Sequence, residues 1–247
     1  MGIITVFTNQ WLFSFFFNFI LISIFQGTPI LTKKGWAHAG ALGTILLGCL
    51  GWNGWLVVAS YLVLGSAVTK IGYKEKKRKG IAESREGKRG PENVWGSAGT
   101  GALISILIKS GFGSDTILLV GFAASFGAKL ADTFGSEIGK RWGKTTVLIT
   151  TLQPVKQGTE GAVSFEGTLA SLFGSIIMTI FMLKFSIINT GYFAVVVVIS
   201  SMVATLLESF VGACLQDKFN WLTNELVNFF QTTFAALFAM LIVYLAG

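Results

Sequence analysis

The sequence contains little histidine, cysteine, proline or charge. Its 247 residues include one histidine, His38, and two cysteines, Cys49 and Cys214, which both lie in apolar segments. A single histidine argues against a histidine-based zinc site and against a Ser-His-Asp hydrolase. The cysteines have no metal-ligand spacing, so we expect packing residues rather than a disulfide. Charged residues are only 13% of the chain, whereas a soluble domain has about 25%, which argues against a soluble protein.

Apolar residues and glycine are abundant instead. Hydrophobic residues make up 52% of the chain, and its mean hydropathy is +0.68. Glycine occurs 30 times, which suits the close packing of helices in lipid. The composition therefore predicts an integral membrane protein that forms a single transmembrane domain over residues 1–247.

Long apolar segments follow one another along the chain. A helix needs about 20 apolar residues to cross the hydrocarbon core of a bilayer. Eight segments are candidates: 6–25, 36–50, 55–71, 94–108, 116–135, 165–183, 192–215 and 226–246. The first lacks a basic leader and is too long for the apolar part of a signal peptide, so we expect it to be retained. The pattern predicts an all-α bundle of about eight (seven to nine) transmembrane helices, in which 36–50 and 94–108 are short enough to be partial spans.

The basic residues fall on one side of this arrangement. Of the 19 Lys and Arg residues, sixteen lie on one predicted side, Lys109 and Lys184 lie on the other, and Lys129 lies inside a span. The positive-inside rule places the sixteen in the cytoplasm, including a basic loop at 72–92 and a Gly-Thr-Glu loop at 140–164. Most acidic residues follow them, so we expect a polar site on the cytoplasmic face. A transporter would more often have polar residues near the membrane midplane.

The end of the segment 116–135 carries the densest cluster of ionisable groups. At about 100° per residue, Lys129, Asp132, Ser136 and Gly139 share one helical stripe, and Glu137 lies about 140° from Asp132. Charge at membrane depth costs several kcal/mol and usually marks a functional site. In one interpretation Asp132 holds a cation and Ser136 holds a phosphate or a metal-bound water. In the other, Lys129 and Asp132 form a neutralised pair inside the bundle.

The Gly-Thr-Glu loop contains Gly158, Thr159, Glu160 and Ser164 just before an apolar segment. Backbone N–H groups at glycines, hydroxyl donors and a following helix N-terminus favour an anion such as phosphate. The loop is not a Walker A motif, and an ordinary turn in which Ser164 caps the next helix is an equal alternative. Glu160 would repel a phosphate unless a metal bridges them, which makes it a candidate Mg²⁺ ligand.

Two further groups complete the candidate site. The basic loop either touches anionic lipid headgroups or uses its C-terminal part, around Arg89, to bind ligand phosphates. Nucleic acid is not an expected partner, since the loop has no interleaved aromatic residues. Glu208 is a second acid within an apolar segment and could meet Asp132. Two such carboxylates would repel each other unless one is protonated or both share Mg²⁺.

Two motifs in this chain resemble a known family. They are Ala-Asp-Thr-x-x-Ser-Glu-x-Gly at 131–139 and Gly-Thr-Glu-Gly-x-Val-Ser at 158–164. They resemble the phytyl-phosphate kinase group of the membrane CTP-dependent polyprenol and phytol kinases, and 129–168 is similar to plant and cyanobacterial members. Because the chain begins at Met1 with an apolar span and no transit peptide, it looks like a cyanobacterial protein of the plasma or thylakoid membrane.

The resemblance implies a kinase that transfers the γ-phosphate of CTP, or of another nucleoside triphosphate, to phytyl phosphate. The product, phytyl diphosphate, is a precursor of tocopherol and phylloquinone. Matching the motifs residue by residue implies three catalytic positions, Asp132, Ser136 and Glu137. The implied or expected nucleotide and phosphate contacts are Lys70, Arg89, Asn93, Lys129, Lys140, Arg141, Gly158, Thr159 and Ser164. The expected Mg²⁺ ligands are Asp132, Glu160 and Glu208.

Some matters stay open at this level. Ser97 stands where the family pattern would have Asn. The acceptor could instead be phytol or another polyprenol. Alternatives of a different class are a membrane lipid transporter and a cytidylyltransferase that makes a CDP-lipid. The sequence does not give the oligomeric state.

Overall fold

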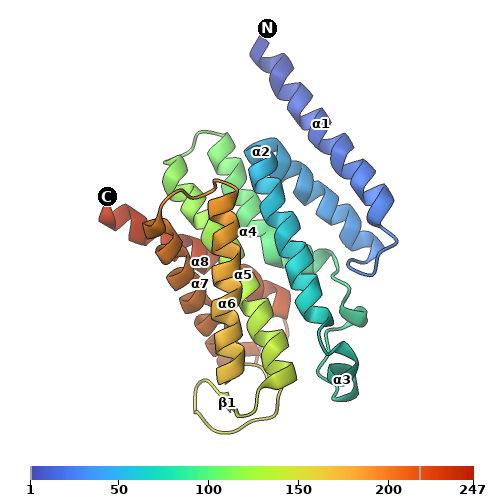
Figure 1. Cartoon of the computed structure of the whole chain (residues 1–247), viewed down its shortest axis with the longest axis vertical. Helices are drawn as coiled ribbons and strands as arrows, with labels where there is room; N and C mark the ends of the chain where they lie inside the picture. Colours follow the sequence, from blue (N-terminus) through green and yellow to red (C-terminus); the bar gives the residue numbers. More distant parts are fainter. Residues whose placement is uncertain (1, 217) are drawn as a thin grey trace.

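The computed structural model describes the backbone of residues 2–216 and 218–247, and side chains from Asn9 onward within these ranges. It is an almost entirely helical bundle (Figure 1). The helices are α1 (Gly2–Phe25), α2 (Lys33–Lys70), α3 (Tyr73–Arg78), α4 (Pro91–Lys109), α5 (Asp115–Trp142), α6 (Phe165–Lys184), α7 (Gly191–Val211) and α8 (Asn224–Ala246). Shorter elements are the 3₁₀ turn η1 (Arg85–Gly87), the π-helical turn η2 (Gly212–Gln216) and the strands β1 (Thr146–Leu148) and β2 (Ala162–Ser164).

Helix α5 forms the core of the bundle. It contacts α2, α4, α6, α7 and α8, and 78% of its most apolar window is buried, against 33–44% for the other long apolar helices. Fully buried Phe122, Phe126 and Leu130 fill the space between it and its neighbours. The outer helices expose large apolar side chains such as Phe173 and Leu237, as expected for surfaces that face lipid. The polar end of α5 is therefore held inside a ring of helices.

The predicted all-α membrane fold is confirmed. Each of the eight predicted segments falls on a helix, and α2, α5, α6, α7 with η2, and α8 are long and apolar enough to cross a membrane. The segments 36–50 and 55–71 belong to one 38-residue helix, α2, which bends at Gly51 (φ 63°, ψ −155°). At 1.5 Å per residue, the length of α2 measured along both halves is about 57 Å, roughly twice the hydrocarbon thickness of about 30 Å. Figure 1 shows its two halves meeting in a V. The count of eight spans stays a prediction.

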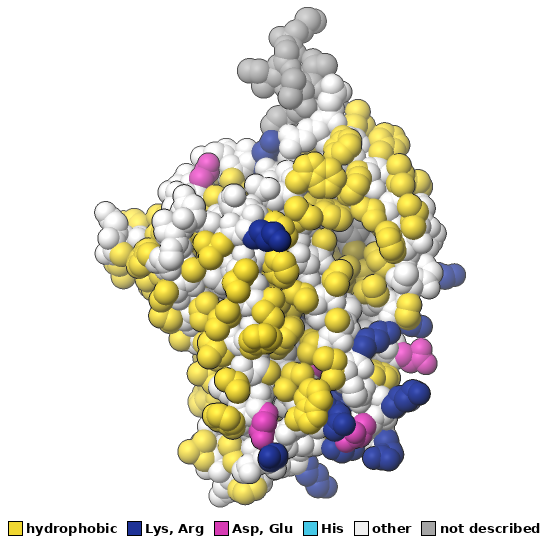
Figure 2. Space-filling model, in the orientation of Figure 1, with side chains coloured by type: hydrophobic (Ala, Val, Ile, Leu, Met, Phe, Trp, Pro, Cys, Tyr) yellow, Lys and Arg dark blue, Asp and Glu magenta, His cyan; other side chains and the backbone are white. Residues whose placement is uncertain are grey.

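Charge is gathered at one end of the molecule. Figure 2 shows Lys and Arg side chains concentrated at the end that carries α3 and β1 in Figure 1, below a broad apolar band. Helices α4 and α6 both begin at this charged end, so Lys109 and Lys184, at their last residues, lie at the other. The one-sided charge pattern predicted from the sequence is present in the fold. Both cysteines are free, as expected.

A small hairpin covers the charged end. The strands β1 and β2 pair in antiparallel register, Thr146 with Ser164 and Leu148 with Ala162. The hydroxyl of Ser164 accepts a hydrogen bond from the backbone N–H of Gly167 (3.1 Å) and caps α6. The loop predicted at 140–164 therefore contains the last residues of α5 and this hairpin, and the capping role considered for Ser164 is confirmed.

Candidate functional site

A cavity of about 410 Å³ lies at the charged end of the bundle, beneath the hairpin. Its walls come from α5, the segment between α3 and α4, the hairpin, and the ends of α6, α7 and α8. All but two of the predicted site residues line it: Arg89, Asn93, Lys129, Asp132, Ser136, Glu137, Lys140, Gly158, Thr159, Glu160, Ser164 and Glu208. The structure thus brings together residues that lie more than 100 positions apart in the sequence.

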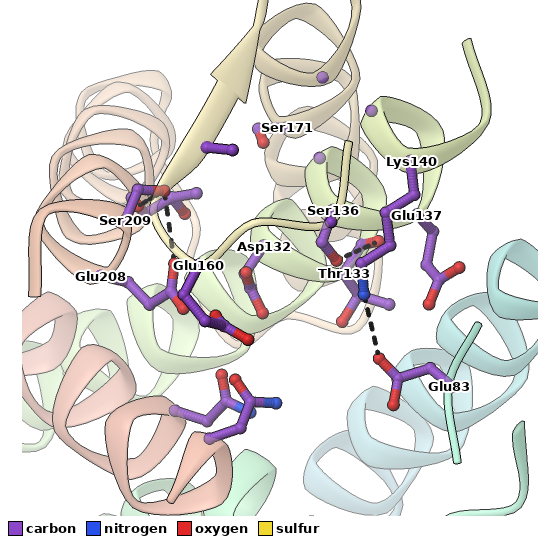
Figure 3. Close-up of a pocket in the computed structure, with 18 of the residues that line it drawn as sticks. Glu83, Asp132, Thr133, Ser136, Glu137, Lys140, Glu160, Ser171, Glu208 and Ser209 are labelled. Carbon is purple, nitrogen blue, oxygen red and sulfur yellow. Dashed lines mark hydrogen bonds and ion pairs between the residues drawn. The ribbon is translucent and has the colours of Figure 1, made fainter. Parts of the chain in front are cut away.

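Three carboxylates from three different elements face one part of this cavity. Asp132 comes from α5, Glu160 from the turn of the hairpin and Glu208 from α7, and Figure 3 shows them directed toward a common space. Within the described ranges, no group of three or more His, Cys, Asp or Glu side chains is arranged to hold a metal ion by itself. The arrangement suits a cation that arrives with substrate phosphates, since Mg²⁺ usually takes only one or two carboxylates from the protein.

Lys129 and Asp132 form a close ion pair within the cavity wall. The ammonium lies 2.6 Å from Oδ2 of Asp132, and the two side chains are only 7% and 14% exposed. The ion pair of the second interpretation is therefore present. It also lines the cavity, where the first interpretation needs Asp132. Ser136 lies one turn further along α5, where its hydroxyl donates to the backbone oxygen of Thr133 (3.3 Å). An anion at this point would meet a cation and a hydroxyl on one helix face.

Arg89 also lines the cavity and is held in place by its backbone and its side chain. Its N–H donates to the oxygen of Ile30 (3.1 Å), and its own oxygen accepts from the N–H of Thr32 (3.0 Å). Its guanidinium donates to the hydroxyl of Tyr61 and lies 5.1 Å from the centre of that ring. A guanidinium fixed in this way can bind phosphate oxygens in two-pronged fashion. The role of Tyr61 could not be predicted from the sequence, because nothing distinguishes it from the other aromatic residues of the apolar segments.

The basic loop is tied to α5 by ion pairs. The ammonium of Lys76, on α3, contacts the carboxylate of Glu137, and these side chains are 1% and 2% exposed. Lys140 pairs with Glu83 (3.6 Å), as Figure 3 shows. In this loop, desolvation and the nearby carboxylates of Glu86 and Glu83 raise the pKa of Tyr73. Glu137, expected to be catalytic, is thus engaged with the loop at the edge of the cavity.

Two expected phosphate contacts, Lys70 and Arg141, lie outside the cavity lining. The ammonium of Lys70 donates to the backbone oxygen of Pro29 (3.0 Å) at the surface. The guanidinium of Arg141 binds both oxygens of Glu75 (3.0 and 2.9 Å) and lies 5.3 Å from the ring centre of Trp142. In this structure these two bases join surface elements to one another, and the phosphate contacts expected of them stay a prediction.

Asn93 lies where the basic loop meets α4 and α8. Its side-chain oxygen accepts from the N–H of Gly90 (2.9 Å) and from Arg85 (2.7 Å), and its amide donates to Glu225 (2.9 Å). The side-chain oxygen and one of the two amide N–H groups of Asn93 are thus already bonded to other parts of the protein. Asn93 therefore shapes the rim of the cavity and positions Arg85.

The hairpin is pressed against the end of α7. Gly161 has φ of 72°, and a Cβ there would lie 2.5 Å from the backbone nitrogen of Ala213 and from the oxygen of Ser209. Only glycine allows this approach, which fixes the neighbouring Glu160 opposite Glu208. Gly158 also has positive φ, and the hydroxyl of Thr159 donates to the oxygen of Lys156 (2.9 Å).

Helices α5 and α6 approach each other closely at Gly135 and Gly139. Helix α6 crosses α5 there, and a Cβ on Gly135 would lie 3.2 Å from the backbone oxygen of Gly167. This contact brings the hydroxyl of Ser171 to the cavity.

One lining residue without an assigned role is Asn228 of α8. Its side chain is 6% exposed. Sequence reasoning gave it no chemistry. The sequence did contain one signal for this residue: an amide that shares a helical face with other polar residues within an apolar segment.

Comparison with known proteins agrees with this description. The chain is 47% identical over 235 residues to an uncharacterised membrane protein of Synechocystis sp., which covers 93% of this chain and 90% of that protein. It is 41% identical over 242 residues to Protein VTE6, chloroplastic, of Arabidopsis thaliana (91% and 69%). It is 29% identical to an uncharacterised membrane protein of Methanocaldococcus jannaschii over 90% of both chains. No solved structure matches it significantly.

The family assignment rests on most of the chain. Residues 16–236 match the family described as integral membrane protein DUF92. The plant and cyanobacterial relatives match more than 90% of this chain. They confirm the resemblance to the phytyl-phosphate kinase group that the motifs at 131–139 and 158–164 indicated. The chain belongs to the DUF92 family of integral membrane proteins.

Proposed function

We propose that this protein is a membrane kinase that transfers the γ-phosphate of CTP, or of another nucleoside triphosphate, to phytyl phosphate. The product would be phytyl diphosphate, for tocopherol and phylloquinone synthesis. The observation that carries the proposal is the facing set of Asp132, Glu160 and Glu208 inside a cavity that also holds Arg89 and Lys140. The 41% identity to the chloroplast protein VTE6 supports the same branch of the family.

The chemistry needs little more than position and charge. Phosphoryl transfer depends mainly on alignment and on neutralising the phosphate oxygens. Asp132, Glu160 and Glu208 are the residues that would hold Mg²⁺ on the triphosphate, and the ion when bound supplies charge neutralisation there. Arg89 and Lys140 bind phosphate oxygens from the side of the basic loop. The ion pair with Lys129 orients Asp132.

The acceptor explains why no histidine is required. A phosphate monoester is already an anion, so it attacks without a strong general base. An alcohol such as phytol would need one, and Asp132 is engaged by Lys129 at 2.6 Å. This contact favours phytyl phosphate over phytol as the acceptor.

The charged end is proposed to face the cytoplasm. Lys and Arg are gathered at this end of the molecule (Figure 2), as the positive-inside rule expects of cytoplasmic segments. Nucleoside triphosphates are available on that side. The lipid acceptor would present its phosphate there while its chain stays in the bilayer.

A transfer assay tests the function. Purified protein is given phytol, phytyl phosphate and geranylgeranyl phosphate, each with γ-³²P-labelled CTP, ATP, GTP or UTP and Mg²⁺. We expect labelled phytyl diphosphate and release of the nucleoside diphosphate. A CDP-lipid with release of pyrophosphate would identify a cytidylyltransferase, and the absence of any product with all acceptors would reject the proposal.

A further inference from the structure

One face of α7 continues the cavity into the membrane part of the bundle. Met202, Thr205, Leu206 and Ser209 line the cavity, and their spacing of three to four residues places them on one helical face. From the facing helix α8, Asn228 lines it as well. The cavity therefore extends from the carboxylates into the seam between α7 and α8.

This seam is closed on its inner side and open on its outer side. The amide of Gln231 donates to the hydroxyl of Thr205 (3.2 Å) and to the oxygen of Ala128 (3.3 Å), which joins α8 to α7 and α5. Leu206, by contrast, lines the cavity, whereas its neighbours on the helix surface at i−3 and i+4, Val203 and Phe210, are 37% and 49% exposed and do not line it. Leu206 therefore lies where the cavity-lining face of α7 meets the outer face of this helix, which is where the cavity wall opens. Because the outer surface of α7 faces lipid, this opening leads to the bilayer.

The lining at the opening is apolar, unlike the rest of the cavity. Among the described residues that line it, Met202, Leu206 and Val163 are the only apolar side chains larger than alanine. Two of them lie together on α7. The bases Arg85, Lys88 and Lys140 come instead from the basic loop and from α5. The cavity thus has a basic part that suits a triphosphate and an apolar part that suits a hydrocarbon.

Asn228 presents an amide to this cavity. Its side chain lines the cavity and is 6% exposed, and it makes no side-chain hydrogen bond to the described part of the chain. Its amide N–H groups can therefore donate to a ligand that enters along α7. An amide donates to a phosphate oxygen without adding charge.

We infer that the seam between α7 and α8 is the entry site for the acceptor, an isoprenoid monophosphate. Its first isoprene units lie against Met202 and Leu206, and its phosphate accepts a hydrogen bond from Asn228 next to the carboxylates. The chain beyond these units stays in lipid. This assignment rests on the proposed kinase function, and it adds the route and the residues that select the acceptor.

Filling the opening tests the route. Leu206→Trp is compared with Val203→Trp, a matched control on the same helix that is 37% exposed and does not line the cavity. We expect Leu206→Trp to raise the KM for phytyl phosphate about tenfold, since it removes binding of the chain rather than transition-state contacts. The KM for the nucleotide, and that for the five-carbon dimethylallyl phosphate, should stay within about twofold. Equal KM values for phytyl phosphate in the two variants would overturn the route.

The role of Asn228 is tested by Asn228→Leu. Leucine keeps the volume and breaks no side-chain hydrogen bond within the described part of the chain, so the melting temperature should not fall. The KM for both phosphate acceptors should rise, while the KM for the nucleotide should not. An unchanged acceptor KM would show that Asn228 does not contact the acceptor.

A cross-linking experiment separates this inference from the kinase proposal. A twenty-carbon isoprenyl monophosphate with a diazirine on its first isoprene unit is photolysed with the full-length protein in nanodiscs, and labelled peptides are identified by mass spectrometry. Label on the α7 segment that contains Met202 and Leu206 upholds the seam even if no phosphate is transferred. Label elsewhere overturns it even if the kinase assay succeeds.

Discussion

The ammonium of Lys76 meets the carboxylate of Glu137 in the most buried ion pair of the described chain, with the two side chains 1% and 2% exposed. Lys76 also donates to the backbone oxygen of Thr69 (3.0 Å). The pair therefore joins α3, the end of α2 and the polar end of α5. Since Lys140 and Glu83 add a second link, the basic loop is fixed over the cavity rather than free in solution.

Breaking this pair should destabilise the protein. Removing one partner of a buried ion pair leaves an uncompensated charge and costs about 3–5 kcal/mol. We expect Glu137→Gln and Lys76→Met each to lower the melting temperature in detergent. The double variant Lys76→Met with Glu137→Leu, which removes both charges, should recover most of the loss. Glu137→Gln that melts like the wild type but loses all activity would instead identify Glu137 as catalytic.

Two arginines provide a matched test of the site boundary. Arg89 lines the cavity, whereas Arg141 binds Glu75 outside it. Lysine keeps the charge but cannot bind phosphate in two-pronged fashion. We expect Arg89→Lys to raise the KM for the nucleotide about tenfold through the loss of one charge-assisted bond of about 1.5–3 kcal/mol. Arg141→Lys should change it less than twofold by the same reasoning. The reverse order would place the phosphate site on the other face of α5.

A single methyl group should displace the hairpin. At Gly161 a Cβ would lie 2.5 Å from the backbone of α7 and η2, so Gly161→Ala must move Glu160 away from Glu208. We expect kcat to fall at least tenfold in the transfer assay. Gly27→Ala is the control, because a Cβ there has no atom within 4 Å. Equal activity of the two variants would show that the position of Glu160 does not matter.

The helices could be predicted because a run of 15 to 20 apolar residues has few other solutions in a membrane. The two separate segments predicted at 36–50 and 55–71 are instead the halves of one helix that bends at Gly51. The strands β1 and β2 could not be predicted, since three residues are too few for any periodicity. Their pairing depends on Gly161 docking against α7, which is a contact between distant segments.

The part of the site that lies on a single helix could be predicted, because helical spacing alone sets which residues share a face. Helical spacing set Asp132 and Ser136 on one face and set Glu137 apart, and the structure has them so. The same spacing places Arg141 about 180° from Asp132, a signal that would have excluded it from the cavity. The partner of Glu137 could not be found, because Lys76 lies 61 residues away in a different element. Tyr61 was missed for the same reason, since its partner Arg89 lies 28 residues away.

The facing carboxylates make the strongest prediction of the proposed chemistry. Asp132→Asn keeps the shape of the side chain but removes the charge that would hold a metal–triphosphate and pair with Lys129. We expect kcat with phytyl phosphate and Mg²⁺ to fall about a hundredfold or more, as when one charged contact to a transition state is lost. Glu208→Gln should do the same, and chelating Mg²⁺ with EDTA should abolish transfer by the wild type. Asp115→Asn, at the far end of α5, is the control and should retain activity. Near wild-type transfer by Asp132→Asn protein would remove Asp132 from the reaction and with it the role assigned to this cavity.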